Sequence, residues 1–151
     1  MRLKELLGGK DGEVVTVSPR SDIAAAVQLL LDHRIGSLPV VDDAGRLLGL
    51  VAERDLLSAL HLDPQTSEAV LIERVMRRPA PACSPDDTVQ DAMAMMTRQR
   101  QRHLVVLDGD VIAGVISVGD IVKHRLDQLE TEAGVLRDVV AGQRASRGSV
   151  D

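Results

Sequence analysis

The 151-residue chain contains no phenylalanine, tryptophan or tyrosine. Proteins that hold single-stranded nucleic acids commonly stack the bases on aromatic rings, and this chain has no residue for such a platform. Basic residues are also in the minority, because 23 acidic residues outnumber 18 lysines and arginines and leave a net charge of −5. This balance disfavours a nucleic-acid partner, which requires a basic surface. Any purine bound here must be held by aliphatic side chains and backbone atoms.

Cysteine and long apolar runs are scarce too. Cys83 is the single cysteine, so no intrachain disulfide can form, and we interpret it as a small buried apolar residue. No apolar run approaches the ~18 residues of a membrane span, and the N-terminus is too charged for a signal peptide. These absences predict a cytoplasmic protein in a reducing compartment, without a membrane partner.

The signatures of common catalytic and metal sites are missing. The sequence has no G-x-x-x-x-G-K-[S/T] loop and no G-x-S-x-G elbow, which argues against treating Ser117, His103 and Asp120 as a catalytic triad. The four histidines are scattered, with no close pair on one helix face, so we predict no metal site. We therefore expect no catalytic residues and no enzyme.

The chain contains an internal repeat. Three pairs of segments align: 17–42 with 83–108, 49–57 with 114–122, and 3–7 with 72–76. The first pair is offset by 66 residues, the second by 65 after one deletion in a turn, and the third by 69. The two halves, called the first and the second repeat below, are therefore one unit used twice.

Each repeat predicts a strand, a helix, two strands and a second helix. A Ser-Pro turn precedes a residue that can cap the first helix, either Ser21 or Asp22 in the first repeat and either Asp86 or Asp87 in the second. Helical spacing predicts these buried stripes: Ile23, Ala26, Val27 and Leu30 in the first repeat, and Val89, Ala92, Met93 and Met96 in the second. Two short apolar strands follow around the turns "DAG" and "DG". The fold class is therefore α+β, with two tandem β-α-β-β-α units packed as a pseudo-two-fold pair.

We expect five segments along the chain: a first unit at 1–60, a linker at 61–74, a second unit at 75–126, a C-terminal helix at 120–141, and a disordered tail at 142–151. Gly142 is a suitable end for the helix. The helix carries an a/d seam of apolar residues: Val122, Leu126, Leu129, Ala133, Leu136 and Val140. The seam can pack on its own chain or on a second copy, and we favour a homodimer. The faces of the repeats, the helix or both can form its interface.

The stretch "GVISVGD", Gly114 to Asp120, has two interpretations. Ser117 and Asp120 have the spacing of a capping box, and on spacing alone this structural interpretation is favoured. Alternatively, a serine at a helix N-terminus can donate to a phosphate, while a carboxylate accepts from both ribose hydroxyls. Gly114 and Gly119 would then let backbone approach a ligand.

Both repeats resemble a known family. "HRIGSLPVVDDAGRLLGLVAERDLL" and "RHLVVLDGDVIAGVISVGDIV" are similar to a tandem pair of cystathionine-β-synthase (CBS) domains, the Bateman module, over about residues 1–126. The layout resembles small free-standing bacterial CBS-domain proteins. The resemblance implies a non-catalytic regulatory sensor that binds an adenosine-containing ligand between the two units, most often AMP, ADP or ATP and sometimes S-adenosylmethionine. The alternative is a protein-interaction module with vestigial ligand sites that acts on an unknown protein target.

The resemblance assigns a main site to eight residues: Ser117, Asp120, Arg102, His103, Val15, Ile35, Gly36 and Gly119. It implies that Ser117, Arg102 and His103 contact phosphates, and that Asp120 takes the ribose. Arginine suits a phosphate because its planar fork stays charged. Val15 and Ile35 would hold the adenine.

The equivalent positions in the other repeat define a weaker mirror site, consisting of Asp55 and Gln101. Asp55 retains the ribose acceptor, but Ala52 replaces the serine hydroxyl. Gly36 and Ser37 stand where the second repeat has Arg102 and His103, so the positive charge is missing. We therefore expect one phosphate-bearing nucleotide per chain.

Overall fold

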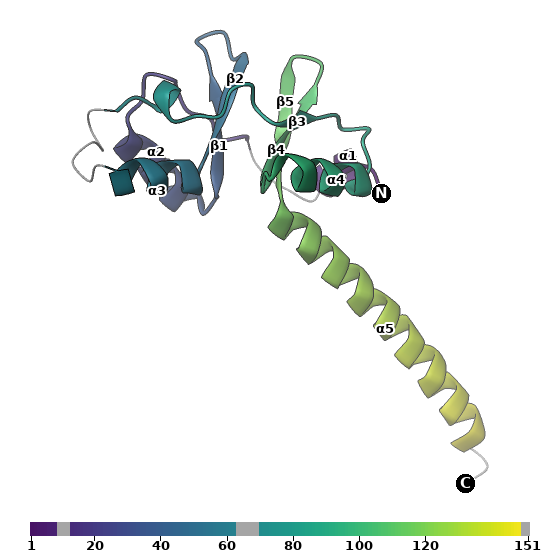
Figure 1. The fold of residues 1–151 in the computed structure, drawn as a ribbon. Helices are drawn as coiled ribbons and strands as arrows, with labels where there is room; N and C mark the ends of the chain where they lie inside the picture. The colour runs from purple at the N-terminus through teal and green to yellow at the C-terminus, as the bar shows by residue number, and fades with distance from the viewer. Residues whose placement is uncertain (9–12, 63–69, 149–151) are drawn as a thin grey trace. The chain divides into compact units, whose positions relative to one another are not determined.

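The computed structural model describes residues 1–8, 13–62 and 70–148. The first repeat contains helix α2 (Ile23–His33), strands β1 (Ser37–Val41) and β2 (Leu47–Ala52), and helix α3 (Glu53–Leu62). β1 and β2 form an antiparallel hairpin, and α2 and α3 pack beside each other (Figure 1). The predicted opening strand is reduced to one parallel bridge between Val17 and Val40.

The second repeat follows the same order. It contains strand β3 (Ala82–Cys83), helix α4 (Val89–Gln99), and the antiparallel strands β4 (His103–Asp108) and β5 (Val111–Ser117). β3 pairs in parallel with β4 and completes a three-stranded sheet. The α+β class and the doubled unit predicted from the sequence are confirmed.

Side chains cap the first helix of each repeat. Asp22 Oδ1 accepts from a backbone N–H in the first turn of α2 at 2.8 Å. Of the two candidate caps for this helix, Ser21 and Asp22, the cap is therefore Asp22. At α4 the prediction of Asp86 or Asp87 is wrong, because Thr88 is the cap. Thr88 Oγ1 accepts from Asp91 N at 3.1 Å and Asp91 Oδ2 accepts from Thr88 N at 3.0 Å, so a reciprocal capping box places the start of the helix.

The similarity of the two repeats includes their unusual backbone conformations. Arg34 and Arg100 cap the C-termini of α2 and α4 with φ of 53° and 52°. Gly45 and Gly109 take positive φ in the two hairpin turns, a backbone conformation that is strained for residues with a side chain but not for glycine. Both hairpins also carry an irregularity at the same place, after Val40 and after Val106.

The segment that precedes each repeat packs on the other repeat. Helix α1 (Leu3–Leu7) lies at the Ser-Pro turn of the second repeat, where Leu3 N donates to the carbonyl of Asp87 at 2.9 Å. The 3₁₀ turn η1 (Ile72–Arg74) lies at the equivalent turn of the first repeat, where Ile72 N donates to the carbonyl of Ser21 at 2.8 Å. The two aligned segments 3–7 and 72–76 are thus exchanged between repeats.

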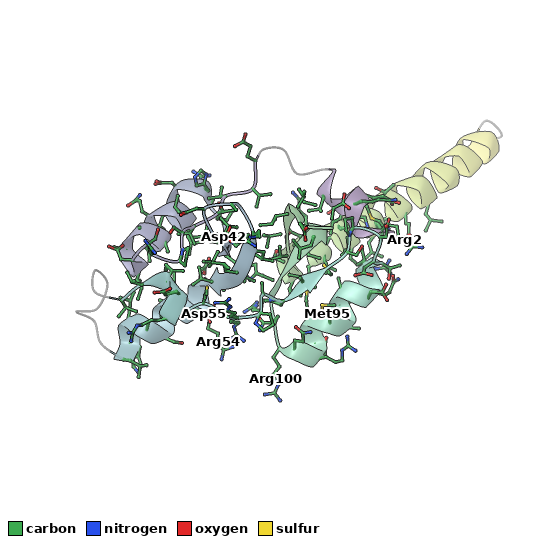
Figure 2. All side chains as sticks on the ribbon, turned by 90° about the horizontal axis from the view of Figure 1, so that it is seen from above. Arg2, Asp42, Arg54, Asp55, Met95 and Arg100 are labelled. Carbon is green, nitrogen blue, oxygen red and sulfur yellow. The ribbon has the colours of Figure 1, made fainter. Side chains whose placement is uncertain are left out.

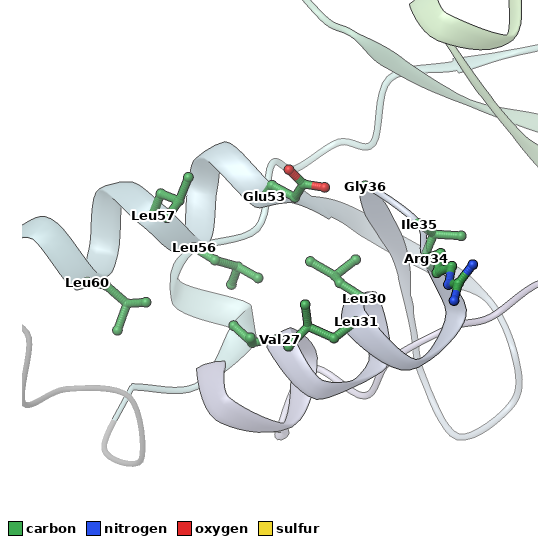
Figure 3. A pocket seen from close by; sticks show the side chains of 10 residues that line it. All are labelled: Val27, Leu30, Leu31, Arg34, Ile35, Gly36, Glu53, Leu56, Leu57 and Leu60. Atoms are coloured by element: carbon green, nitrogen blue, oxygen red, sulfur yellow. The ribbon is translucent and has the colours of Figure 1, made fainter.

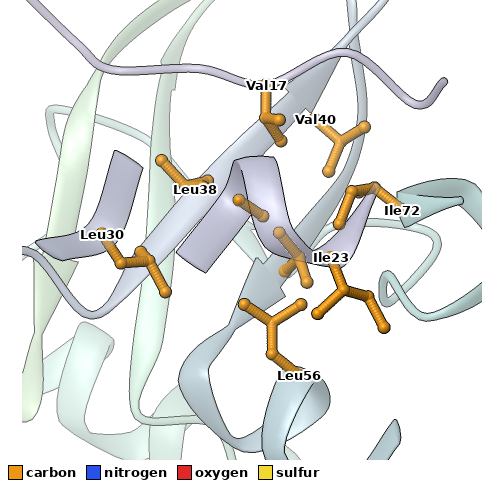
Figure 4. Packing of buried hydrophobic residues seen from close by; sticks show 9 residues of the cluster. Val17, Ile23, Leu30, Leu38, Val40, Leu56 and Ile72 are labelled. Carbon is orange, nitrogen blue, oxygen red and sulfur yellow. The ribbon is translucent and has the colours of Figure 1, made fainter. Parts of the chain in front are cut away.

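Aliphatic side chains from the hairpin and both helices of the first repeat form its core (Figure 4). The cluster consists of Val17, Ile23, Ala26, Leu30, Leu38, Val40, Val51, Leu56 and Ile72. Ile72 comes from η1, so the exchanged segment contributes to this core. In the second repeat the predicted stripe is buried at Ala92 and Met96, but Met93 is 50% exposed, contrary to the prediction.

Helix α5 (Val118–Gly148) begins directly after β5. Residues Met1–Val118 form one compact unit, and a second begins at Gly119. The helix does not end near 141 as predicted but continues through Gly142, since a single glycine inside a helix costs only ~1 kcal/mol. The rest of the predicted tail, 149–151, and the central part of the predicted linker, 63–69, lie outside the described residues.

The seam of α5 is apolar and exposed at four positions: Val122, Leu126, Leu129 and Leu136. The side chain of Val140 lies outside the described residues. Within the described part of the chain, no helix is long and apolar enough to cross a membrane.

Candidate functional site

The ends of β4 and β5 bring three of the predicted main-site residues to one edge. His103 opens β4 and is paired across the ladder with Ser117, the last residue of β5. The carbonyl of Arg102 accepts from Val118 N at 2.9 Å, so the residue before β4 is held beside the start of α5. Arg102, His103 and Ser117 therefore lie together although His103 and Ser117 are 14 positions apart in the sequence. Asp120 follows in the first turn of α5.

His103 also meets the first repeat. A Cβ at Gly36 would lie 2.9 Å from His103 Nε2 and 3.3 Å from Glu53 Oε1. A Cβ at position 36 would require the imidazole to move from this place. The structure thus brings Gly36 and His103, two predicted main-site residues from different repeats, into contact. It adds the carboxylate of Glu53, which the sequence analysis did not include in the main site.

The mirror edge has the same backbone frame with different side chains. Ser37 pairs with Ala52 where the other edge pairs His103 with Ser117. The carbonyl of Gly36 accepts from Glu53 N at 3.0 Å, as that of Arg102 accepts from Val118 N. Both repeats share this backbone frame, but Ala52 stands at the position of Ser117 and Gly36 at the position of Arg102.

Asp55 of the mirror site lies in the first turn of α3 (Figure 2) and already has two partners within the chain. Its Oδ2 accepts from Ala52 N at 2.9 Å. Its Oδ1 lies 3.4 Å from Nε of Arg77, and the side chain of Asp55 is only 12% exposed. The expected ribose acceptor is therefore engaged within the protein.

The predicted adenine side lies against the core of the first repeat. Val15 and Ile35 both pack on that core, and Gln101 occupies the position equivalent to Ile35 in the second repeat. Ile35 and Gly36 also border a pocket of about 550 Å³ between α2 and α3 (Figure 3). Its lining residues are Val27, Leu30, Leu31, Arg34, Ile35, Gly36, Glu53, Leu56, Leu57 and Leu60. The pocket therefore belongs to the first repeat and does not include Ser117 or Arg102.

Gly114 lies against a side chain of the exchanged N-terminal segment. A Cβ there would lie 2.7 Å from a methyl carbon of Leu7 in α1. At the equivalent position in the first repeat, a Cβ on Gly49 would lie 2.6 Å from the carbonyl oxygen of Arg77. Both glycines admit the exchanged segments. Gly119 is exposed in the first turn of α5.

Cys83 is buried, as predicted. Loss of hydration raises the pKa of its thiol to about 11, and the charge of Asp87 adds to the effect. The thiol is therefore protonated at neutral pH, which agrees with the interpretation of Cys83 as a core residue.

Two functional candidates were missed from the sequence: Glu53 beside His103, and Arg77 beside Asp55. Both contacts join residues far apart in the chain. The alignment of the two repeats could have drawn attention to both residues. Glu53 is aligned with Val118 and Arg77 with Gly8, so each charged residue stands opposite an uncharged one.

Comparison with known proteins identifies the architecture. The family model for the CBS domain matches residues 10–62 and again residues 72–127. The chain belongs to the CBS-domain family. Its two CBS domains form a tandem pair, which confirms the resemblance.

Similar proteins include small CBS-domain proteins. The crystal structure of a CBS-domain containing protein from Agrobacterium tumefaciens is 36% identical, with a TM-score of 0.77 over 82% of this chain and 92% of that one. The CBS domain-containing protein YhcV of Bacillus subtilis is 29% identical over 76% of this chain and 80% of its own length. The chain spans only 35% of an uncharacterised 33.4 kDa relative from Thermofilum pendens, at 29% identity over 72% of this chain.

One similar structure contains ligands. The CBS domain pair of protein MJ0100, 24% identical with a TM-score of 0.74 over 85% of this chain and 98% of that one, was crystallised with 5′-methylthioadenosine and S-adenosyl-L-methionine. At this identity the similarity establishes the shared fold.

Proposed function

We propose that this CBS-domain pair is a non-catalytic sensor that binds an adenosine-containing ligand, most favourably AMP, ADP or ATP, at the main site. The observation that carries the proposal is the meeting of the two repeats at His103. This residue pairs with Ser117 across β4 and β5 and lies against Gly36 of the first repeat. Adenosyl ligands bound to the MJ0100 pair support the ligand class.

Each part of the ligand has a chemically suitable partner in this proposal. The Ser117 hydroxyl and the N-terminus of α5 suit a phosphate, because helix N-termini favour anions. The carboxylate of Asp120 suits the ribose hydroxyls, since an ionised carboxylate only accepts hydrogen bonds. Val15 and Ile35 supply aliphatic surface for the adenine, which the absence of aromatic residues requires.

Charge at the main site favours a phosphate only modestly. Arg102 supplies a fixed positive charge, but its side chain is exposed. Glu53 approaches the same point as His103 and offsets part of the positive potential there. An exposed charge pair contributes about 0.2–1 kcal/mol, so the arginine tunes phosphate affinity more than it determines binding.

Calorimetric titration tests the proposal. The unmodified protein is expected to bind one AMP per chain. Arg102→Ala is expected to lower the affinity for AMP about two- to fivefold and to leave the affinity for adenosine unchanged. Adenosine lacks the phosphate that the guanidinium contacts and therefore serves as the internal control. No heat with AMP, ADP, ATP or S-adenosylmethionine, together with no nucleotide absorption in the purified protein, would contradict the sensor proposal. The absorption test is sensitive because the chain has no aromatic residues.

The exposed seam of α5 favours a second function, self-association as part of a protein-interaction module. Four apolar residues of the seam are exposed in the isolated chain, which suits a two-helix interface between copies. Replacing Leu129 with glutamate is expected to weaken a homodimer about tenfold, because it removes part of the ~1.5–3 kcal/mol available from burying a leucine. Light scattering measures the change, with Gln128→Glu, which is exposed and faces away from the seam, as the control. A monomeric unmodified protein at micromolar concentration would exclude this function.

A further inference from the structure

The ion pair between Asp55 and Arg77 closes the carboxylate of the mirror site. One oxygen of Asp55 accepts from Ala52 N at 2.9 Å, and the other lies 3.4 Å from Arg77 Nε. A ribose needs these same oxygens for its two hydroxyls, because only an acceptor can receive both. With the carboxylate 12% exposed, little of it remains open to a ligand.

The backbone holds Arg77 in place. Arg77 N donates to the carbonyl of Leu50 at 2.8 Å, and Leu50 N donates to the carbonyl of Arg77 at 3.1 Å. The bare Cα of Gly49 lets the chain approach this closely, since a Cβ would lie 2.6 Å from the carbonyl oxygen of Arg77. The backbone of Arg77 is therefore fixed beside β2, and from there its side chain reaches the carboxylate of Asp55.

The position of the second repeat that aligns with Arg77 is a glycine. The alignment of 3–7 with 72–76 continues to Gly8 opposite Arg77, and glycine has no side chain with which to pair. The two repeats thus share the aspartate, at 55 and 120, but differ at the position aligned with Arg77.

We propose that Arg77 keeps the mirror site closed by occupying Asp55, and that an uncharged residue at position 77 opens a second site for a neutral nucleoside. The ligand class follows from the surrounding residues: the mirror edge has Ala52 in place of Ser117, and Gly36 and Ser37 in place of Arg102 and His103. A phosphate would be left there without these partners, and an unpaired charge removed from water is costly. The inference rests on the proposed adenosyl-binding function.

Calorimetry with adenosine on the full chain tests this inference. The unmodified protein is expected to bind one adenosine per chain, and Arg77→Met to bind two. The double variant Arg77→Met with Asp55→Ala is expected to return to one, because the additional site depends on the released carboxylate. All three proteins are expected to bind one AMP per chain at the main site. This binding also shows that each variant is folded.

Two further variants act as matched controls. Arg77→Lys keeps a cation beside Asp55 and is expected to bind one adenosine. Arg78→Met removes an adjacent exposed arginine and is also expected to bind one. If Arg77→Met does not fold, Arg77→Gln provides the same removal of charge with a polar side chain and is expected to bind two.

The outcomes separate this inference from the function on which it rests. An unmodified protein that binds neither AMP nor adenosine contradicts the proposed sensor, yet a gain of one Asp55-dependent site in Arg77→Met would still support the role of Arg77. A folded Arg77→Met or Arg77→Gln with no more sites than the unmodified protein overturns the inference. Loss of a site in these variants also overturns it, because Arg77 would then be a ligand contact.

Discussion

Replacing Asp120 with alanine is expected to lower the affinity for AMP by about ten- to a hundredfold. A hydrogen bond to a charged group contributes about 1.5–3 kcal/mol, and the loss of one such bond to the ribose corresponds to this change in affinity. The free energy of unfolding is expected to fall by only about 0.3–1 kcal/mol, the value of an acidic residue in the first turn of a helix. Calorimetric titration measures the first quantity and denaturant unfolding the second.

Asp55→Ala is the matched control for this prediction. It removes the same side chain from the equivalent position of the first repeat, together with a hydrogen bond to Ala52 N and the ion pair with Arg77. We expect it to reduce stability while leaving AMP affinity unchanged, since the mirror site lacks phosphate partners. Equal loss of AMP affinity in both variants would mean that Asp120 acts through helix stability. Unchanged affinity in a folded Asp120→Ala variant would restore the capping interpretation alone.

Gly49→Ala is expected to destabilise the protein by about 1–3 kcal/mol, the usual cost of overpacking a buried position. The added Cβ would lie 2.6 Å from the carbonyl oxygen of Arg77 and 2.8 Å from the sulfur of Met76. That carbonyl accepts from Leu50 N at 3.1 Å, so relief of the clash requires breaking a backbone bridge. Thermal unfolding should show a decrease in Tm of roughly 2–4 °C for each kcal/mol lost.

Gly114→Ala provides the comparison. Its Cβ would lie 2.7 Å from Leu7 Cδ2, the end of a side chain that can change rotamer, rather than from backbone. We therefore expect a smaller loss, below about 1 kcal/mol, at the equivalent position of the other repeat. A loss at Gly114 as large as that at Gly49 would show that Leu7 is as rigid as the bridge between Leu50 and Arg77.

Local patterns in the sequence determined much of the architecture. The internal repeat, the helical stripe from Ile23 to Leu30 and the turns around Gly45 and Gly109 predicted the elements and their doubling. These features depend on neighbours a few residues apart, where spacing and backbone preference act directly. The same local signals were less reliable at the ends of helices. Thr88 rather than an aspartate caps α4, and α5 passes Gly142, because a cap depends on the hydrogen bonds that form and not on residue type alone.

The tertiary structure alone decided which segment covers which repeat. Residues 3–7 and 72–76 are similar, and both repeats present a Ser-Pro turn, so neither segment carries a local signal that distinguishes its own repeat from the other. Their exchange buries Ile72 in the first core and brings Arg77 to Asp55. In the same way, no spacing in the sequence places His103 against Gly36 and Glu53. These contacts arise because two nearly equivalent units pack against each other and share chain segments, so their partners lie far apart in the sequence and become neighbours only when both units are folded.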